Sequence, residues 1–281
     1  MNSSVAAGRL YVVSTPIGNL GDFSFRAIDV LRGVALILAE DTRHSRTLLD
    51  RYEIRTPVAS HHEHNEAKMT PGLVARLRGG EDLALISDAG TPLLSDPGAR
   101  LVSAALDAGV VVTPIPGASA LLSALVASGI NSERFTFYGF LPRKGRDRAS
   151  TLAELASLPH TAIVYEAPTR LAETLTELEA LGAGERKIAV AREMTKQYEE
   201  VRRGTVSTLR AYYENTPPRG EVVIVIAGAE LPAVNESDVR ARARALIAEG
   251  RSARDVVAQL VAELGVARNR AYEIAQEAAN A

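Results

Sequence analysis

The sequence contains no cysteine, and only four of its 32 cationic residues are lysines: Lys68, Lys144, Lys187 and Lys196. Without cysteine there can be no disulfide framework, thiolate nucleophile, iron–sulfur cluster or cysteine zinc site. Nothing in the sequence therefore requires an oxidising compartment. Arginine supplies most of the positive charge and suits bidentate phosphate contacts, although a biased genome base composition would give the same preference.

Long apolar runs and a strong net charge are also missing. No stretch reaches the ~18 uninterrupted apolar residues of a membrane span, and Met1–Arg9 lacks the cationic start and apolar core of a secretory signal. The net charge of -2 is too low in magnitude for a chain that simply coats nucleic acid or an anionic membrane. We therefore expect a cytoplasmic globular protein without a membrane partner, and 281 residues predict about two domains.

Short apolar runs alternate with helical patterns in the first half of the chain. Runs without polar alternation are typical of strands buried on both faces of a parallel sheet. The expected strands are Leu10–Ser14, Val34–Ala39, Leu83–Ser87 and Val110–Ile115, and the helical patterns include Leu73–Leu77 and Leu101–Ala108. This alternation predicts a mostly parallel α/β sheet.

The second half repeats this pattern after the turn at Pro114–Gly117, where we place a domain boundary. We predict an N-terminal α/β domain over 1–116, a second α/β domain over 117–230, and a helical extension over 236–281. The expected elements of the second domain are strands near Phe135–Gly139, Thr161–Tyr165, Lys187–Ala191 and Val222–Ala227, and helices over Arg148–Leu158 and Thr169–Leu181. Leu171, Leu175, Leu178 and Leu181 share one face of the last helix and are expected in the core.

Three short amphipathic helices are expected in the extension. Ser252 and Asp255 resemble a capping box, and Gly265 should end the second of these helices. The order of the helices resembles a helix-turn-helix, but the segment carries no net charge. RNA binding and a packing or dimerising role both remain open.

The four expected strands of the first half end in loops rich in small or acidic residues. These loops are Ser14–Asp22, Ala39–Arg43, Ser87–Gly98 and Pro116–Ala120. Ligands bind at the carboxyl ends of strands in open α/β sheets, and small residues allow close approach to the backbone. The loops therefore predict a ligand cleft. Their acidic character favours a ligand with hydroxyls, an amine and positive charge over a phosphate-rich one.

These loops, with His62–Glu66 and Tyr165–Arg170, resemble the tetrapyrrole-methylase superfamily. Within it, Gly139–Gly145 and Ala191–Lys196 are most similar to the bacterial ribosomal RNA small subunit methyltransferase I subgroup. The resemblance covers about residues 9 to 228. It implies two α/β domains with a cofactor cleft between them, plus a small C-terminal helical extension.

The resemblance also implies a function. It predicts that the protein binds S-adenosylmethionine without a metal and forms a homodimer. The predicted reaction is methylation of the ribose 2′-hydroxyl of a cytidine, in small-subunit ribosomal RNA or in the assembled small subunit. Carried over by motif position, the cofactor-binding residues are Pro16, Gly18, Asp88, Leu94, Ser119, Ala120, Glu166 and Gly220.

Methyl transfer to a hydroxyl depends largely on positioning, and a base can take the hydroxyl proton. The candidates for this base are Glu40, Asp41 and Glu193. Arg43 and Lys196 are candidates for holding RNA phosphate and complete the predicted catalytic set. The cationic stretch from Arg134 to Arg148, interpreted as a linker, is a further candidate for phosphate contact.

Three alternatives stay open at this stage. His61, His62 and His64 could suggest zinc, but a solvated or substrate-facing loop is the favoured interpretation. A small-molecule methylase of the corrinoid type would share the fold and cofactor. A non-enzymatic RNA-binding protein on the same fold is the third alternative, which the intact cleft loops disfavour.

Overall fold

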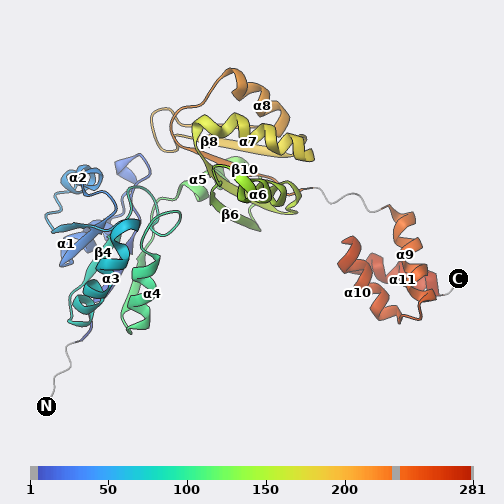
Figure 1. Cartoon of the computed structure of the whole chain (residues 1–281), viewed down its shortest axis with the longest axis horizontal. Coiled ribbons are helices and arrows are strands. Elements are labelled where there is room, and N and C mark those ends of the chain that lie inside the picture. Colours follow the sequence, from blue (N-terminus) through green and yellow to red (C-terminus); the bar gives the residue numbers. More distant parts are fainter. Residues whose placement is uncertain (1–5, 230–234, 280–281) are drawn as a thin grey trace, which may run out of the picture. The chain divides into compact units, whose positions relative to one another are not determined.

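The computed structural model describes residues 6–229 and 235–279. They fall into two compact units, one extending to Ala227 and the other beginning at Gly228. The first unit contains two five-stranded sheets with their helices, and the second contains only helices (Figure 1). The predicted division of the first unit at residue 116 stays a prediction. Residues 1–5, 230 and 280–281 of the predicted ranges lie outside the described residues.

The first sheet is entirely parallel, with strand order β3-β2-β4-β1-β5. Its strands are β1 (Arg9–Val13), β2 (Leu36–Ala39), β3 (Val58–Ser60), β4 (Leu83–Ile86) and β5 (Val111–Ile115). The parallel arrangement confirms the prediction made from the apolar runs. The short strand β3 was not expected, because three residues are too few for a recognisable pattern.

Helices cover both faces of the first sheet. One face packs against α1 (Phe25–Gly33) and α2 (Thr42–Arg51), and the other against α3 (Glu63–Arg78) and α4 (Ala99–Asp107). Leu31 and Leu49 are buried in the first of these cores, and Leu77 and Leu101 in the second. This three-layer packing leaves the carboxyl ends of the strands free to carry loops.

The second sheet has the order β6-β7-β10-β8-β9 and is mixed. Its strands are β6 (Phe135–Phe140), β7 (Thr161–Glu166), β8 (Lys187–Arg192), β9 (Glu200–Thr205) and β10 (Val222–Ile226). Only β6 and β7 run parallel, whereas β10 is antiparallel to both β7 and β8, and β8 to β9. The expectation of a mostly parallel sheet is wrong here, because a continuous apolar run such as Val222–Ile226 is compatible with either strand direction.

One face of this sheet packs against α6 (Gly145–Ser157), α7 (Leu171–Leu178) and α8 (Val206–Asn215). The other face packs against α5 (Ala120–Ser128), which follows β5 directly. Leu181 is 46% exposed and lies outside the predicted core face. Regular α-helix ends at Leu178, and the following π-helical turn contains Gly182 at a φ of 86°.

Two further expectations for the second half need correction. Arg134–Arg148 is not a linker, since it contains strand β6 and the start of α6. Arg148 is buried and pairs with Glu166 and Glu177. It therefore cannot contact RNA phosphate, whereas Arg143, Lys144 and Arg146 are exposed.

The second unit consists of α9 (Glu236–Ala248), α10 (Ala253–Leu264) and α11 (Arg268–Ala279) around a core of its own. The Oγ of Ser252 accepts a hydrogen bond from the backbone N–H of Asp255, and Gly265 ends α10 at a φ of 63°. Both predicted helix boundaries are confirmed. No helix among residues 6–229 and 235–279 is long and apolar enough to cross a membrane.

Candidate active site

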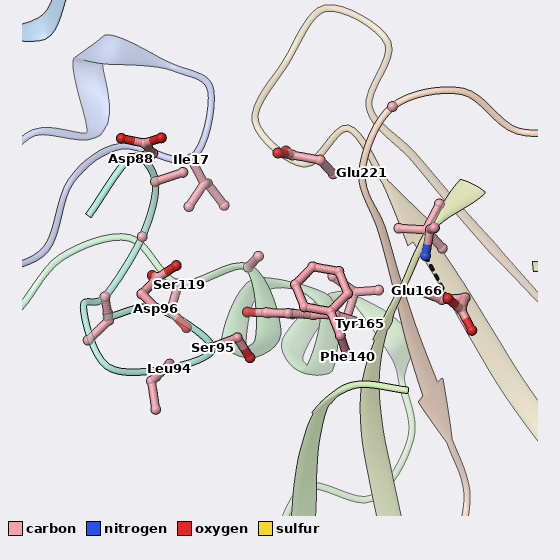
Figure 2. Close-up of a pocket in the computed structure, with 18 of the residues that line it drawn as sticks. Ile17, Asp88, Leu94, Ser95, Asp96, Ser119, Phe140, Tyr165, Glu166 and Glu221 are labelled. Carbon is pink, nitrogen blue, oxygen red and sulfur yellow. Dashed lines mark hydrogen bonds between the residues drawn. The ribbon is translucent and has the colours of Figure 1, made fainter. Parts of the chain in front are cut away.

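The loops at the ends of four strands of the first sheet meet at one cavity of about 370 Å³, as the sequence predicts (Figure 2). Ile17 comes from the loop after β1, and Glu40 directly follows β2. The loop after β4 contributes Asp88–Thr91 and Leu94–Asp96, and Ser119 and Ala120 follow β5. We call this space the first cavity. Its volume lies within the ~300–1,000 Å³ typical of small-molecule sites.

Two of these loops are bonded to each other. The backbone N–H of Thr15 donates to the carbonyl of Gly90 over 2.8 Å, and the N–H of Gly90 donates to that of Thr15 over 3.0 Å. Gly90 has a φ of 79°, and a Cβ there would lie 3.3 Å from the Cγ2 of Ile17. A valine at residue 90 would therefore strain this bridge and narrow the cavity.

The second sheet supplies the opposite wall of the first cavity. Phe140 ends β6, Tyr165 lies near the end of β7, and Gly220 and Glu221 precede β10. Figure 2 shows the Tyr165 ring reaching toward the loop that carries Asp96. Burial raises the pKa of Tyr165, with Asp96 and Glu221 acting in the same direction. Aromatic rings thus face carboxylates across the cavity.

Acidic groups gather on the first-sheet side. Burial raises the pKa of Asp96 to about 6, and the nearby charges of Glu40 and Asp88 add to the shift. The pKa of Glu40 is also raised, mainly by burial and next by repulsion from the charge of Asp88. Asp96 was missed as a candidate, because only the fold brings it close to Glu40. Its place in the Ser87–Gly98 loop was the available signal.

The backbone of two loops is strained beside these groups. Leu93 and Ser95 have φ angles of 76° and 74°, and Glu193 and Thr195 have φ angles of 51° and 66°. Such conformations are uncommon outside glycine and concentrate at functional sites. The strain lies in the predicted Ser87–Gly98 loop and in the segment that carries Glu193 and Lys196.

The predicted cofactor residues divide between two neighbouring cavities. The first cavity is lined by Asp88, Leu94, Ser119, Ala120, Glu166 and Gly220. Pro16 and Gly18 line a second cavity, also of about 370 Å³, which shares Ile17, Asp88, Ala89 and Glu221 with the first. A Cβ at Gly18 would lie 2.4 Å from Cγ of Lys196, so the two loops touch there.

Glu166 lines the first cavity, but its carboxylate is occupied elsewhere. It is fully buried, pairs with Arg170 at 2.5 Å and with Arg148 at 3.5 Å, and accepts a hydrogen bond from Thr174 over 2.7 Å. Figure 2 shows this carboxylate bonded to the backbone N–H of Ala167. Glu166 therefore anchors β7 to α6 and α7.

The five predicted catalytic residues do not form one cluster. Glu40 faces the first cavity. Asp41 caps α2 and pairs with Arg43, whose hydrogen bonds hold the pKa of Asp41 below its usual value. The side chain of Arg43 is 91% exposed.

Glu193 and Lys196 form a separate pair at the second cavity. The Nζ of Lys196 lies 2.9 Å from Glu193 and 2.8 Å from Glu221. The hydrogen bond from Lys196 lowers the pKa of Glu193. Burial disfavours the charged amine, but Glu221 and Glu193 outweigh it and raise the pKa of Lys196. Lys196 is therefore a cation near neutral pH.

The three neighbouring histidines differ in environment, and of these His64 is exposed on α3. His61 is buried and has no hydrogen-bond partner for its ring among the described residues, and burial lowers its pKa. The interpretation of a solvated or substrate-facing loop is therefore wrong for His61. His62 caps α3. Within residues 6–229 and 235–279, no group of three or more His, Asp or Glu side chains is arranged to hold a metal ion.

Comparison with known proteins supplies the context for this geometry. Residues 9–210 match the family described as Tetrapyrrole (Corrin/Porphyrin) Methylases. The protein named Ribosomal RNA small subunit methyltransferase I from Synechocystis sp. is 46% identical, over 96% of this chain and 98% of its own length. The protein of the same name from Bacillus subtilis is 40% identical, over 97% and 95%.

Solved structures resemble the chain in fold. A uroporphyrin-III C-methyltransferase from Thermus thermophilus, complexed with S-adenyl homocysteine, has a TM-score of 0.56 at 18% identity, covering 78% of this chain and 97% of its own. Cobalt precorrin-4 methyltransferase has a TM-score of 0.58 at 19% identity, covering 78% and 94%. At these identities the similarity concerns the fold alone.

Proposed function

The chain belongs to the tetrapyrrole methylase family, within the group of ribosomal RNA small subunit methyltransferase I proteins, and from this premise we propose that it is an S-adenosylmethionine-dependent methyltransferase of small-subunit ribosomal RNA. The observation that carries the proposal is the first cavity, built from four strand-end loops and walled by the second sheet. The acceptor is proposed to be the ribose 2′-hydroxyl of a cytidine, on free RNA or on the assembled subunit.

The first cavity fits such a cofactor. Its carboxylates, Glu40, Asp88 and Asp96, complement a ligand that carries an amine and a sulfonium charge. Phe140 and Tyr165 provide aromatic surface for a purine ring. Gly90 has no Cβ, so a ligand can approach its backbone closely. We assign the cofactor-binding role to Asp88, Leu94, Ser119, Ala120 and Gly220, with Pro16 and Gly18 at the adjoining end. Glu166 also lines the first cavity, and its proposed part is to hold β7 in place there, since its carboxylate is paired with Arg148 and Arg170.

When bound, S-adenosylmethionine would supply a methyl group that forms a bond to the ribose oxygen as its bond to sulfur breaks, leaving a neutral thioether. The protein has to hold the acceptor oxygen in line and provide a site for its proton. Of the three candidate bases, Glu40 suits this role best. It faces the first cavity and its pKa is raised, whereas those of Asp41 and Glu193 are lowered.

Arg43 and Lys196 are proposed to hold RNA phosphate. Arg43 is exposed on α2, and the partly exposed Lys196 is cationic, so both side chains can offer positive charge to a phosphate.

We also propose that the protein is a homodimer and that it is located in the cytoplasm. Light scattering of the purified chain tests the dimer, and a mass equal to one chain would exclude it.

A methyl-transfer assay tests the function directly. Small ribosomal subunits from a strain lacking this gene, incubated with the protein and tritiated S-adenosylmethionine, should gain label in their RNA. Mapping 2′-O-methyl positions with and without the gene should show one difference, at a cytidine. Label on a tetrapyrrole and none on RNA would instead support the small-molecule methylase. A protein that binds RNA but shows no binding of S-adenosylmethionine in calorimetry would support the non-enzymatic RNA-binding protein.

A further inference from the structure

The second cavity borders the first and has a separate polar lining. It lies among the loop after β1, the first turns of α2 and the segment that carries Lys196. Ile17, Asp88, Ala89 and Glu221 line both spaces. An acceptor that is to meet a methyl donor in the first cavity has to approach through an adjoining space, because the reacting atoms must come within about 3.5 Å of each other.

The side chains of the second cavity match those that hold a nucleobase. Ile17, Leu20 and Leu48 provide apolar surface. His44, Ser45 and Thr47 provide polar groups from the first half of α2. Enzymes that act on nucleotides commonly hold a base between apolar side chains and bond its edge with a few polar groups.

Ser45 provides an independent observation that points to a ligand site. It is 3% exposed and lines the second cavity, yet its Oγ has no hydrogen-bond partner among the described residues. Leaving a buried hydroxyl unpaired is costly. A helical serine often bonds the carbonyl four residues earlier, but the Oγ of Ser45 makes no such bond within the part of the chain that the structure describes. A ligand atom in the second cavity would satisfy the hydroxyl.

Cations lie on the elements that form the second cavity. Arg43 and Arg46 are exposed on the same helix as Ser45, and Lys196 lines the second cavity. Two of the Lys196 hydrogens are directed to Glu193 and Glu221. An ammonium group has three donors, so one remains for a phosphate or a carbonyl.

We propose that the second cavity receives the target nucleoside of the RNA, turned out of its strand, with Ser45 bonded to the edge of its base and its ribose at the wall shared with the first cavity. This rests on the proposed function. Phosphates on either side of the nucleoside contact Arg43, Arg46 and Lys196, and these contacts position the strand without reading its sequence.

Two substitutions test the proposal through RNA without altering the donor site. Thr47 is exposed at the rim of the second cavity, so Thr47→Phe fills the space without entering the core. Ser45→Ala removes only the hydroxyl. Ser103 is exposed on α4 and lines neither cavity, so Ser103→Phe and Ser103→Ala are the matched controls.

Kinetics with small ribosomal subunits and tritiated S-adenosylmethionine give the first readout. Thr47→Phe should lower kcat/KM for the subunit roughly tenfold or more, and Ser45→Ala should lower it roughly 2- to 10-fold, the range of one hydrogen bond. Both controls should match the wild type. Calorimetry should give all four variants a wild-type Kd for S-adenosylmethionine, and thermal melting should show them folded.

The outcomes distinguish a failure of the nucleoside site from a failure of the proposed function. If wild-type protein methylates the subunit and Thr47→Phe does so equally well, the second cavity does not hold the nucleoside and the proposed function stands. If Thr47→Phe mainly weakens S-adenosylmethionine binding, the cavity belongs to the donor site and the inference falls. If the wild type transfers no methyl group to RNA, the function and the inference fall together.

Discussion

The carboxylate of Glu193 fills the space that a side chain at residue 220 would need. A Cβ at Gly220 would lie 2.0 Å from the Oε1 of Glu193 and 2.3 Å from its Cδ. The same Oε1 accepts hydrogen bonds from the Nζ of Lys196 and from the backbone N–H of Glu221. Gly220 therefore allows the Lys196 pair to form at the wall between the two cavities.

Gly220→Ala should displace Glu193 and weaken its pair with Lys196. Because Gly220 and Glu221 line the first cavity, we expect a roughly tenfold weaker Kd for S-adenosylmethionine, equivalent to about 1.4 kcal/mol. Gly182→Ala is the control, since Gly182 has a similar φ of 86° but nothing within 4 Å of its added Cβ. Calorimetry of both variants measures the effect. Equal affinities in the two variants would mean that displacing Glu193 does not disturb the donor site.

Asp96 should make ligand binding depend on pH. Its pKa of about 6 means that it is largely neutral at pH 5 and charged at pH 8. A cationic ligand should therefore bind more tightly as the pH rises through 6. Asp96→Asn should flatten this dependence between pH 5 and 8, as measured by the Kd for S-adenosylmethionine. An unchanged pH profile in that variant would place the responsible charge elsewhere.

The same group affects stability in a direction that can be worked out. The folded-state pKa of Asp96 is raised above its ordinary value of 3.8, so its contribution to stability is present below pH 3.8 and is lost as the pH rises through about 6. Asp96→Asn removes this loss. The variant should be more stable than the wild type at pH 8, by ~1 to 3 kcal/mol, and gain less at pH 5. Denaturant titrations at both pH values check the sign.

The loops that follow the buried strands of the first sheet could be predicted as cavity walls from the sequence. The carboxyl ends of parallel strands lie at the same edge of a sheet, where ligands bind. The sequence did not reveal β9, since Glu200–Thr205 is polar and has no apolar run. The pKa of Asp96 is raised first by burial and then by the charge of Glu40, which lies on another loop. Neither the burial nor such a distant neighbour can be inferred from the residues around Asp96 in the sequence.

Arg148 shows a second kind of limit. In the sequence it belongs to a row of cations that resembles a solvated surface, but the fold turns it inward to Glu166 and Glu177. Whether a cation lies inside or outside depends on partners that only the tertiary structure brings near. The fold therefore separates Arg148 from Arg143, Lys144 and Arg146.

Arg148→Ala should destabilise the protein strongly. It would leave the buried carboxylate of Glu166 without one of its cations, and breaking a buried pair typically costs about 3–5 kcal/mol. Denaturant unfolding measures the loss. A change below ~1 kcal/mol would mean that Arg170 and Thr174 are sufficient to hold Glu166.

Replacing Arg143, Lys144 and Arg146 together by alanine should affect RNA binding and leave stability unchanged, in contrast to Arg148→Ala. These side chains are exposed, so stability should stay near that of the wild type. If they contact phosphates, RNA binding weakens and the logarithmic salt slope falls by ~0.7 to 0.9 for each lost contact. Titration at several salt concentrations measures the slope, with alanine at Arg78 and Arg100, exposed residues of α3 and α4, as the control. An unchanged slope would identify the three as solvated cations.

The helical unit after Gly228 has a core of its own and should therefore unfold as a separate unit. Leu260 is fully buried in that core, and Leu260→Ala should destabilise the unit by about 2–5 kcal/mol. The neighbouring Val261 is 37% exposed, so Val261→Ala is the control and should shift stability far less. Calorimetry should show Leu260→Ala lowering one transition while the transition of residues 6–227 stays in place. A single transition that shifts as a whole would instead mean that the two units unfold together.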